Sequence, residues 1–139
     1  QLRSEGFVLF YDKHERLEGE KMIKGTGLDI IEIDRVRNLV NKQPRFAERI
    51  LTEREMVTYN YLNDRRRIEF LAGRFAAKEA FSKALGTGIG KEVGFLDIVI
   101  LADEKGKPFI LEPIKDGVHL SITHCESYAA AQVIIEENK

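Results

Sequence analysis

Hydrophobic positions recur along this chain with two different periods, and each period predicts a different part of the fold. The stretch Phe70–Gly90 carries leucine, phenylalanine and alanine at near-helical spacing, followed by three glycines. This pattern predicts a slim helix that packs closely on both sides and ends at Gly86. Asn63 and Asp64 supply the polar cap at which we expect this long central helix to begin.

The other elements follow from the same patterns. Residues 23–33 predict a first strand that is buried on both faces. Three short helical segments come next, beginning near residues 35, 45 and 53. Asp34 is the predicted cap of the first, and Thr52 caps the third in a capping box with Glu55. After residue 94 the pattern changes to strands, which are predicted at 95–101, 109–111, 118–124 and 128–135.

Helices in the first half and antiparallel strands in the second indicate an α+β fold, with helices packed on an antiparallel sheet. A chain of 139 residues is most simply one domain. We assign this domain to residues 22–139, because Met22 opens the first strand. Residues 1–21 lack the long apolar centre of a signal peptide, and we interpret them as a leader or extension outside the native domain.

Charge is unevenly distributed although the net charge is only −1. Residues 35–54 hold six basic and two acidic residues, and residues 65–91 hold seven basic and two acidic ones, giving +4 and +5. A basic middle suits a polyanionic ligand or an acidic partner, with a solvated charged face as the alternative for any single residue. The lone Cys125 fits a cytoplasmic protein. No apolar run is long enough to span a membrane, so we expect no membrane partner.

Two acidic residues lie where a carboxylate is costly. Asp29 interrupts the apolar first strand, and Glu79 shares a helix face with Phe75, which we expect in the core. Two carboxylates in oxygen-rich surroundings suit Mg²⁺, which commonly takes ligand phosphates as well. The alternative for Glu79 is a structural ion pair with Lys83, four residues on, and the residues alone favour neither interpretation.

Cations and glycines surround Glu79 in the sequence. Arg74, Lys78 and Lys83 lie within about two helical turns of it. The glycine-rich exit at 86–90 follows, and backbone N–H groups in such a turn can form a concavity that holds an anion. Together these features predict a Mg²⁺–polyphosphate site. A Walker-type loop is excluded, because the glycines follow a helix rather than precede one.

Three segments carry a resemblance to a known family. They are GTGLDIIEIDRV at 25–36, FLAGRFAAKEAFSKALGTGIG at 70–90 and HLSITHCESYAAAQVIIE at 119–136. They resemble the bacterial holo-[acyl-carrier-protein] synthases, which belong to the 4'-phosphopantetheinyl transferase superfamily. The resemblance runs from Met22 to about Glu136, with the motifs in the family's order.

The resemblance implies the 4'-phosphopantetheinyl transferase fold and a specific reaction. The family transfers 4'-phosphopantetheine from coenzyme A to a serine of acyl carrier protein and releases adenosine 3',5'-bisphosphate. Asp29 and Glu79 match its two Mg²⁺ ligands, and Lys83 is our candidate for stabilising charge on the leaving side. For the base, we favour Glu79 acting through a water bound to the metal, with solvent or a partner carboxylate as alternatives.

The resemblance also implies binding surfaces. The coenzyme-binding residues that it implies are Arg65, Arg66, Arg74, Lys78, Lys83, Gly86, Gly88 and His124. The residues that match its docking surface for acyl carrier protein are Arg35, Arg45, Phe46 and Arg49. A basic, partly apolar patch suits an acidic carrier protein, because complementary charge speeds encounter and sets orientation. The family is usually a homotrimer with active sites between neighbouring subunits.

Three other interpretations compete with this one. A catalytically silent module that binds coenzyme A or a nucleotide would not need the paired acids Asp29 and Glu79. A broader-specificity transferase acting on peptide or polyketide synthase carriers would typically contain two copies of this unit. A nucleic-acid binder would explain the basic stretches but not the two acids, so we expect no nucleic-acid partner.

Overall fold

The computed structural model describes residue 19 and residues 21–138. The predicted leader, residues 1–21, therefore lies outside the described residues apart from Gly19 and Lys21. Lys21 already belongs to the first strand, where it pairs with Asn138, so the strand begins before the predicted boundary at Met22.

The α+β prediction is confirmed. In chain order the elements are β1 (Lys21–Glu32), α2 (Ile33–Lys42), α3 (Phe46–Ile50), α4 (Glu53–Tyr61), α5 (Asp64–Leu85), the 3₁₀ helix η1 (Phe95–Asp97), β2 (Val99–Ala102), β3 (Pro108–Glu112), β4 (Val118–His124) and β5 (Tyr128–Asn138). The strands β1, β5 and β4 form an antiparallel sheet in that spatial order, and β2 pairs with β3 in a separate hairpin.

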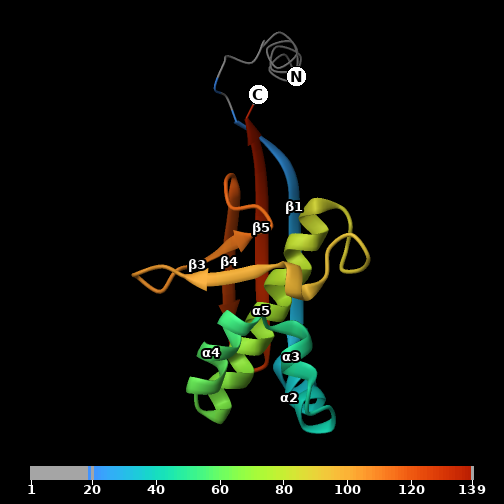
Figure 1. Cartoon of the computed structure of the whole chain (residues 1–139), viewed down its shortest axis with the longest axis vertical. Coiled ribbons are helices and arrows are strands. Elements are labelled where there is room, and N and C mark those ends of the chain that lie inside the picture. The colour runs from blue at the N-terminus through green and yellow to red at the C-terminus, as the bar shows by residue number, and fades with distance from the viewer. Residues whose placement is uncertain (1–18, 20, 139) are drawn as a thin grey trace, which may run out of the picture.

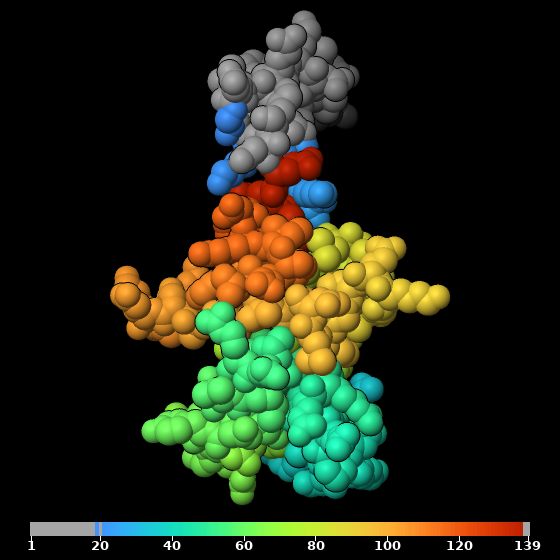
Figure 2. Space-filling view, in the orientation of Figure 1, coloured from blue at the N-terminus to red at the C-terminus, as the bar shows by residue number. Residues whose placement is uncertain are grey.

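Figure 1 shows how these elements are arranged in space. The long strands β1 and β5 run along the molecule with α5 beside them, and the β2–β3 hairpin crosses at an angle. The helices α2, α3 and α4 gather at one end, where their surfaces lie side by side in Figure 2. In the part of the chain that the structure describes, no helix combines the length and apolar character needed to span a membrane.

The core lies between α5 and the three-stranded sheet. Strand β4 alternates as predicted, with Leu120 buried, Val118 and Ile122 partly buried, and the residues between them exposed. Val133 on the central strand β5 is fully buried opposite Leu120. The alternation places apolar side chains on the face that α5 covers.

Two glycines bring β1 unusually close to α5. A Cβ atom on Gly27 would lie 1.7 Å from the Ala80 carbonyl oxygen, and one on Gly25 would lie 2.0 Å from that of Ala84. Any side chain at either position would therefore collide with the helix backbone. This close approach fixes which residues of β1 face α5, and so it positions Asp29, two residues beyond Gly27.

The ends of α5 follow the sequence prediction. The Asn63 side chain caps the N-terminus by accepting a hydrogen bond from the backbone N–H of Arg66 at 3.0 Å. The helix ends at Gly86, whose φ of 85° lies in the left-handed region. The capping box predicted at Thr52 is also present at the start of α4, where Glu55 is its reciprocal partner.

Three local predictions are wrong. Asp34 does not cap α2, because the helix already begins at Ile33 and Asp34 instead pairs with Arg37 in the first turn. The first strand is not buried on both faces, since Leu28 and Ile30 are 67% and 65% exposed. Residues 95–97 form a 3₁₀ turn rather than the start of a strand, because the Asp97 carboxylate accepts a hydrogen bond from the Gly94 N–H.

Candidate active site between strand β1 and helix α5

The close contact of β1 with α5 brings together a carboxylate and a cation that are 54 residues apart in sequence. The Lys83 Nζ donates to Asp29 Oδ1 at 3.0 Å and to the Leu28 carbonyl oxygen at 3.1 Å. The Asp29 side chain is only 15% exposed, whereas that of Lys83 is 50% exposed. Lys83 therefore contacts Asp29 while remaining open to solvent.

Glu79 lies one helical turn before Lys83 and completes this group. Burial raises the pKa of Glu79, the nearby Asp29 carboxylate raises it further, and Lys83 partly offsets both effects. The two carboxylates therefore repel each other, and the structure brings together the three residues predicted to carry the chemistry: Asp29, Glu79 and Lys83.

The donor set suits a hard divalent cation that shares its coordination with a phosphate ligand. The electrostatic cost that Asp29 imposes on the Glu79 carboxylate would be relieved by a cation. Within the described residues, no group of three or more histidine, cysteine, aspartate or glutamate side chains could hold a metal by itself. Mg²⁺ commonly binds one or two carboxylates and completes its shell with waters and substrate phosphates.

The glycine turn after α5 has the predicted backbone shape but not the predicted free donors. Gly86 and Gly88 have φ values of 85° and 66°, and a Cβ atom at either would meet nothing within 4 Å. The N–H of Gly86 donates to Lys83 O, and those of Thr87 and Gly88 donate to Ser82 O. These N–H groups close the helix end, so the glycines shape the turn without offering an anion-binding concavity from these three donors.

Two further predicted coenzyme residues, from distant segments, meet at Glu69 on α5. Arg65 Nε lies 3.4 Å from Glu69 Oε1, and His124 Nε2 lies 3.9 Å from Glu69 Oε2. The side chains of Arg65 and His124 are 79% and 52% exposed, and Arg66 is exposed as well. The structure thus gathers the end of β4 and the start of α5 into one accessible, cation-bearing surface.

Arg74 is more enclosed than the other predicted coenzyme residues. Its guanidinium carbon lies 4.4 Å from the centroid of the Phe70 ring, and its Nε is buried with no hydrogen-bond partner among the described residues. Burial lowers the pKa of Arg74, while the charge of Glu55 raises it. A buried donor without a partner is uncommon in proteins, and it is compatible with a ligand acceptor at this position.

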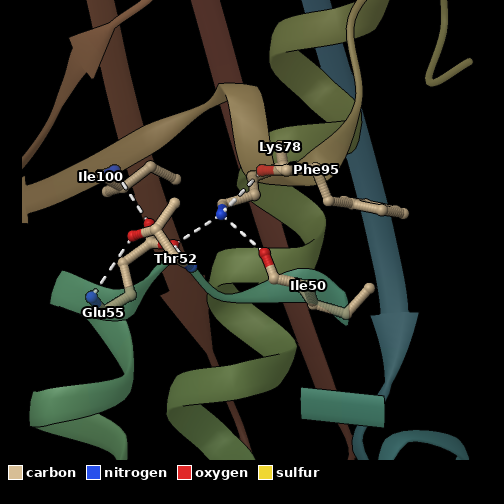
Figure 3. A network of polar contacts seen from close by, with 6 residues as sticks. All are labelled: Ile50, Thr52, Glu55, Lys78, Phe95 and Ile100. Atoms are coloured by element: carbon tan, nitrogen blue, oxygen red, sulfur yellow. Dashed lines mark hydrogen bonds and ion pairs between the residues drawn. The ribbon is translucent and has the colours of Figure 1, made fainter. Parts of the chain in front are cut away.

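The assignment of Lys78 to the coenzyme site is a correction. Its side chain is fully buried, and its Nζ donates to Glu55 Oε1 at 2.6 Å, to Ile50 O at 2.7 Å and to Phe95 O at 3.0 Å. Figure 3 shows these acceptors converging on Nζ. An ammonium group has three donors, so Lys78 has none left for a ligand. The sequence signal for its partner was the capping-box glutamate Glu55, which we had assigned only to a helix cap.

The docking surface on α2 and α3 also needs one correction. Arg35, Arg45 and Arg49 are exposed, as a docking role requires. Phe46 is only 9% exposed and packs in the core, with its ring centroid 6.4 Å from that of Phe75. Phe46 therefore packs beneath the docking surface and does not form part of it. A helix as short as α3 is held to the core by its few apolar side chains.

The comparisons with known proteins agree on one family. A model of the 4'-phosphopantetheinyl transferase superfamily matches residues 25–133. A holo-[acyl-carrier-protein] synthase of Anoxybacillus flavithermus is 59% identical over 116 residues, covering 83% of this chain and 97% of that protein. One of Bacillus pumilus is 60% identical over 117 residues, with the same two coverages.

A solved structure shares the fold as well. The crystal structure of a holo-(acyl-carrier-protein) synthase from Bacillus anthracis, in complex with CoA (3',5'-ADP), matches with a TM-score of 0.79 and 52% sequence identity. The match covers 84% of this chain and 99% of that one.

Proposed function

The chain belongs to the 4'-phosphopantetheinyl transferase superfamily, and from this premise we propose that it transfers 4'-phosphopantetheine from coenzyme A to a serine of apo-acyl carrier protein. The products are holo-acyl carrier protein and adenosine 3',5'-bisphosphate. The observation that carries the proposal is the meeting of Asp29, Glu79 and Lys83 where β1 and α5 approach most closely.

We further propose that the reaction depends on Mg²⁺ held by Asp29 and Glu79. When bound, Mg²⁺ would neutralise the pyrophosphate of coenzyme A and stabilise the charge that develops during transfer. Asp29 is nearly buried and held by Lys83, so its carboxylate has a defined orientation. Glu79 already bears an electrostatic cost as a free carboxylate, which favours a cation beside it.

The chain's own residues account for the remaining steps. The serine Oγ attacks the β-phosphorus and a new P–O bond forms, while the bond from β-phosphorus to the oxygen it shares with the α-phosphate breaks. The electron pair of that bond leaves with adenosine 3',5'-bisphosphate, and Lys83, half exposed beside Asp29, stabilises its charge. Glu79, acting through a water, accepts the serine proton.

The partner surfaces follow from the exposed cations. Arg35, Arg45 and Arg49 on and beside α2 and α3 form a basic surface for the acidic carrier protein. The coenzyme would contact the surface that carries Arg65, Arg66 and His124, with Arg74 nearby on α5.

We also propose a homotrimer in the cytoplasm. Leu28 and Ile30, the sequence neighbours of Asp29, lie on the open face of β1 and are 67% and 65% exposed. A subunit contact on that face would bury apolar surface next to the site. The exposed, unpaired Cys125 is compatible with a reducing compartment. Sedimentation equilibrium on the wild-type protein and on Leu28→Glu/Ile30→Glu would test the trimer, which the double variant should dissociate.

The deciding experiment is incubation of the purified protein with apo-acyl carrier protein, coenzyme A and Mg²⁺, followed by intact-mass measurement. We expect the carrier to gain one phosphopantetheine group, and EDTA to prevent that gain. A folded protein that binds coenzyme A without modifying the carrier would instead be the silent binding module.

The Glu79→Gln variant tests the site itself. We expect it to fold normally and to lose transfer, because the amide neither holds the cation well nor accepts a proton. Circular dichroism provides the control for folding, and near-normal turnover in this variant would remove Glu79 from the mechanism.

A further inference from the structure

The buried ion pair between Lys78 and Glu55 has no part in the proposed chemistry, yet Lys78 precedes the proposed metal ligand Glu79 directly. We propose that Lys78 and Glu55 are positioning residues that fix the rotation of α5 about its axis and so aim Glu79 at Asp29. This inference rests on the proposed function, because it assigns the pair a task in building the same site.

The pair is saturated by protein groups on both sides (Figure 3). Lys78 uses all three of its donors inside the protein, as described above. Glu55 Oε1 also accepts from the Thr52 N–H at 2.7 Å, and Oε2 accepts from the Ile100 N–H at 2.9 Å. Both side chains are 0% exposed, so water cannot substitute for any of these contacts. The geometry of the network is therefore determined by the protein alone.

The contacts of the pair come from separate parts of the chain. Ile50 ends α3, Glu55 lies in the first turn of α4, Phe95 begins η1 and Ile100 lies in β2. A rotation of α5 would have to break bonds to several elements at once. The network therefore holds α5 against rotation from the side of the helix away from β1.

On the other side, α5 meets β1 through small residues. The buried residues of this helix include five alanines, at 72, 76, 77, 80 and 84, and two glycines of β1 lie directly against Ala80 and Ala84. Small side chains form shallow ridges, which interlock less firmly than large ones. This contact between small residues sets how close α5 lies to β1, and the polar network adds directional contacts that oppose rotation of the helix.

Rotation matters because successive residues of a helix point about 100° apart. Any roll of α5 that displaces Lys78 moves Glu79 by the same angle, away from Asp29. A displacement of about 1 Å in a catalytic group can cost on the order of 10²-fold in rate. Outer-shell residues that orient metal ligands typically change metal affinity by about 10- to 100-fold when mutated.

The use of charge at this buried position supports the same reading. A buried ion pair is often no more stabilising than apolar residues of equal volume, because desolvation offsets the attraction. A directional network does, however, select one arrangement of the elements that it joins.

The test uses Glu55→Gln, because Glu55 lies on α4 and is not part of the proposed ligand set. We expect the Mg²⁺ concentration for half-maximal rate to rise about tenfold, with little change in the half-saturating coenzyme A concentration at saturating Mg²⁺. Binding of Mn²⁺ to the protein, followed by electron paramagnetic resonance with coenzyme A present, should weaken by a similar factor. This second measurement does not depend on turnover.

Two further variants complete the design. Lys78→Met/Glu55→Gln removes both charges of the pair together, so it provides a folded protein if Glu55→Gln alone does not fold, and it should show the same shift. Leu120→Ala removes core volume from β4 and leaves the network intact, so its metal dependence should remain that of the wild type.

Wild-type Mg²⁺ and Mn²⁺ dependence in the folded network variants would overturn the inference, and so would an equal shift in Leu120→Ala. Failure of the wild-type protein to modify the carrier would refute the proposed function instead, and the Mn²⁺ titration would still test the positioning role.

Discussion

Helix α5 carries two lysines, five residues apart, that each form an ion pair with a carboxylate from another element. The two pairs have the same chemistry but different surroundings. Lys78 and Glu55 lie 2.6 Å apart and are both 0% exposed. Lys83 and Asp29 lie 3.0 Å apart and are 50% and 15% exposed. The first pair is enclosed by protein acceptors, whereas the second borders solvent next to Glu79.

The difference shows that solvent exposure and unused hydrogen-bond donors, not residue type, separate a structural ion pair from a reactive one. Among the described residues, Lys83 donates to Leu28 O and Asp29, and half of its side chain can turn toward a ligand. Lys78 cannot do so without breaking the contacts that join α5 to its neighbours. Three substitutions would test this comparison.

The largest effect on stability is expected for Lys78→Met. Removing the ammonium leaves the Glu55 carboxylate buried and unpaired, which typically costs about 3–5 kcal/mol. Urea unfolding followed by circular dichroism would measure this loss. The matched control is Lys83→Met, which should cost no more than about 1 kcal/mol because its pair is partly solvated. Equal losses in the two variants would contradict the contrast.

The next effect concerns activity, for which we expect Lys83, not Lys78, to be directly involved. Lys83→Met should lower the rate of transfer by about 10²-fold at saturating Mg²⁺, because a cation that stabilises developing charge is lost. Initial rates of phosphopantetheine transfer, measured by intact mass at several time points, would show it. A normal rate would mean that Lys83 only holds Asp29 in place.

The smallest effect is a pH-dependent gain in stability for Glu79→Gln without metal. The folded protein raises the pKa of Glu79 above its ordinary value of 4.5, so folding penalises the charged form. The penalty is absent below pH 4.5 and grows as pH rises through the raised folded pKa.

The variant should therefore be more stable than the wild type near pH 7 in EDTA, and equally stable below pH 4.5. Solvent screening of this partly exposed group keeps the gain below about 1 kcal/mol. Thermal melts across this pH range would measure the difference. A variant that is less stable at neutral pH would show that Glu79 is a structural partner of Lys83.

Much of the fold could be predicted because its signals are local. The helical spacing in 70–90, the polar caps Asn63 and Thr52, and the alternation in 118–124 each involve residues only a few positions apart. The pattern failed where a tertiary contact decides the outcome. Leu28 and Ile30 look like core residues in sequence, yet α5 covers only the opposite face of β1.

The site divides in the same way. Sequence by itself identified Asp29 and Glu79 as chemically unusual, because acids are costly in apolar segments whatever they face, and it placed Lys83 among the cations near Glu79. It could not separate Lys78 from Lys83, since both lie on one helix in similar sequence surroundings. Only the tertiary structure decided that Glu55 and two carbonyl oxygens enclose one lysine while the other stays open. The physical reason is that burial and hydrogen-bond saturation depend on segments far apart in the chain, and no local pattern encodes which of them will meet.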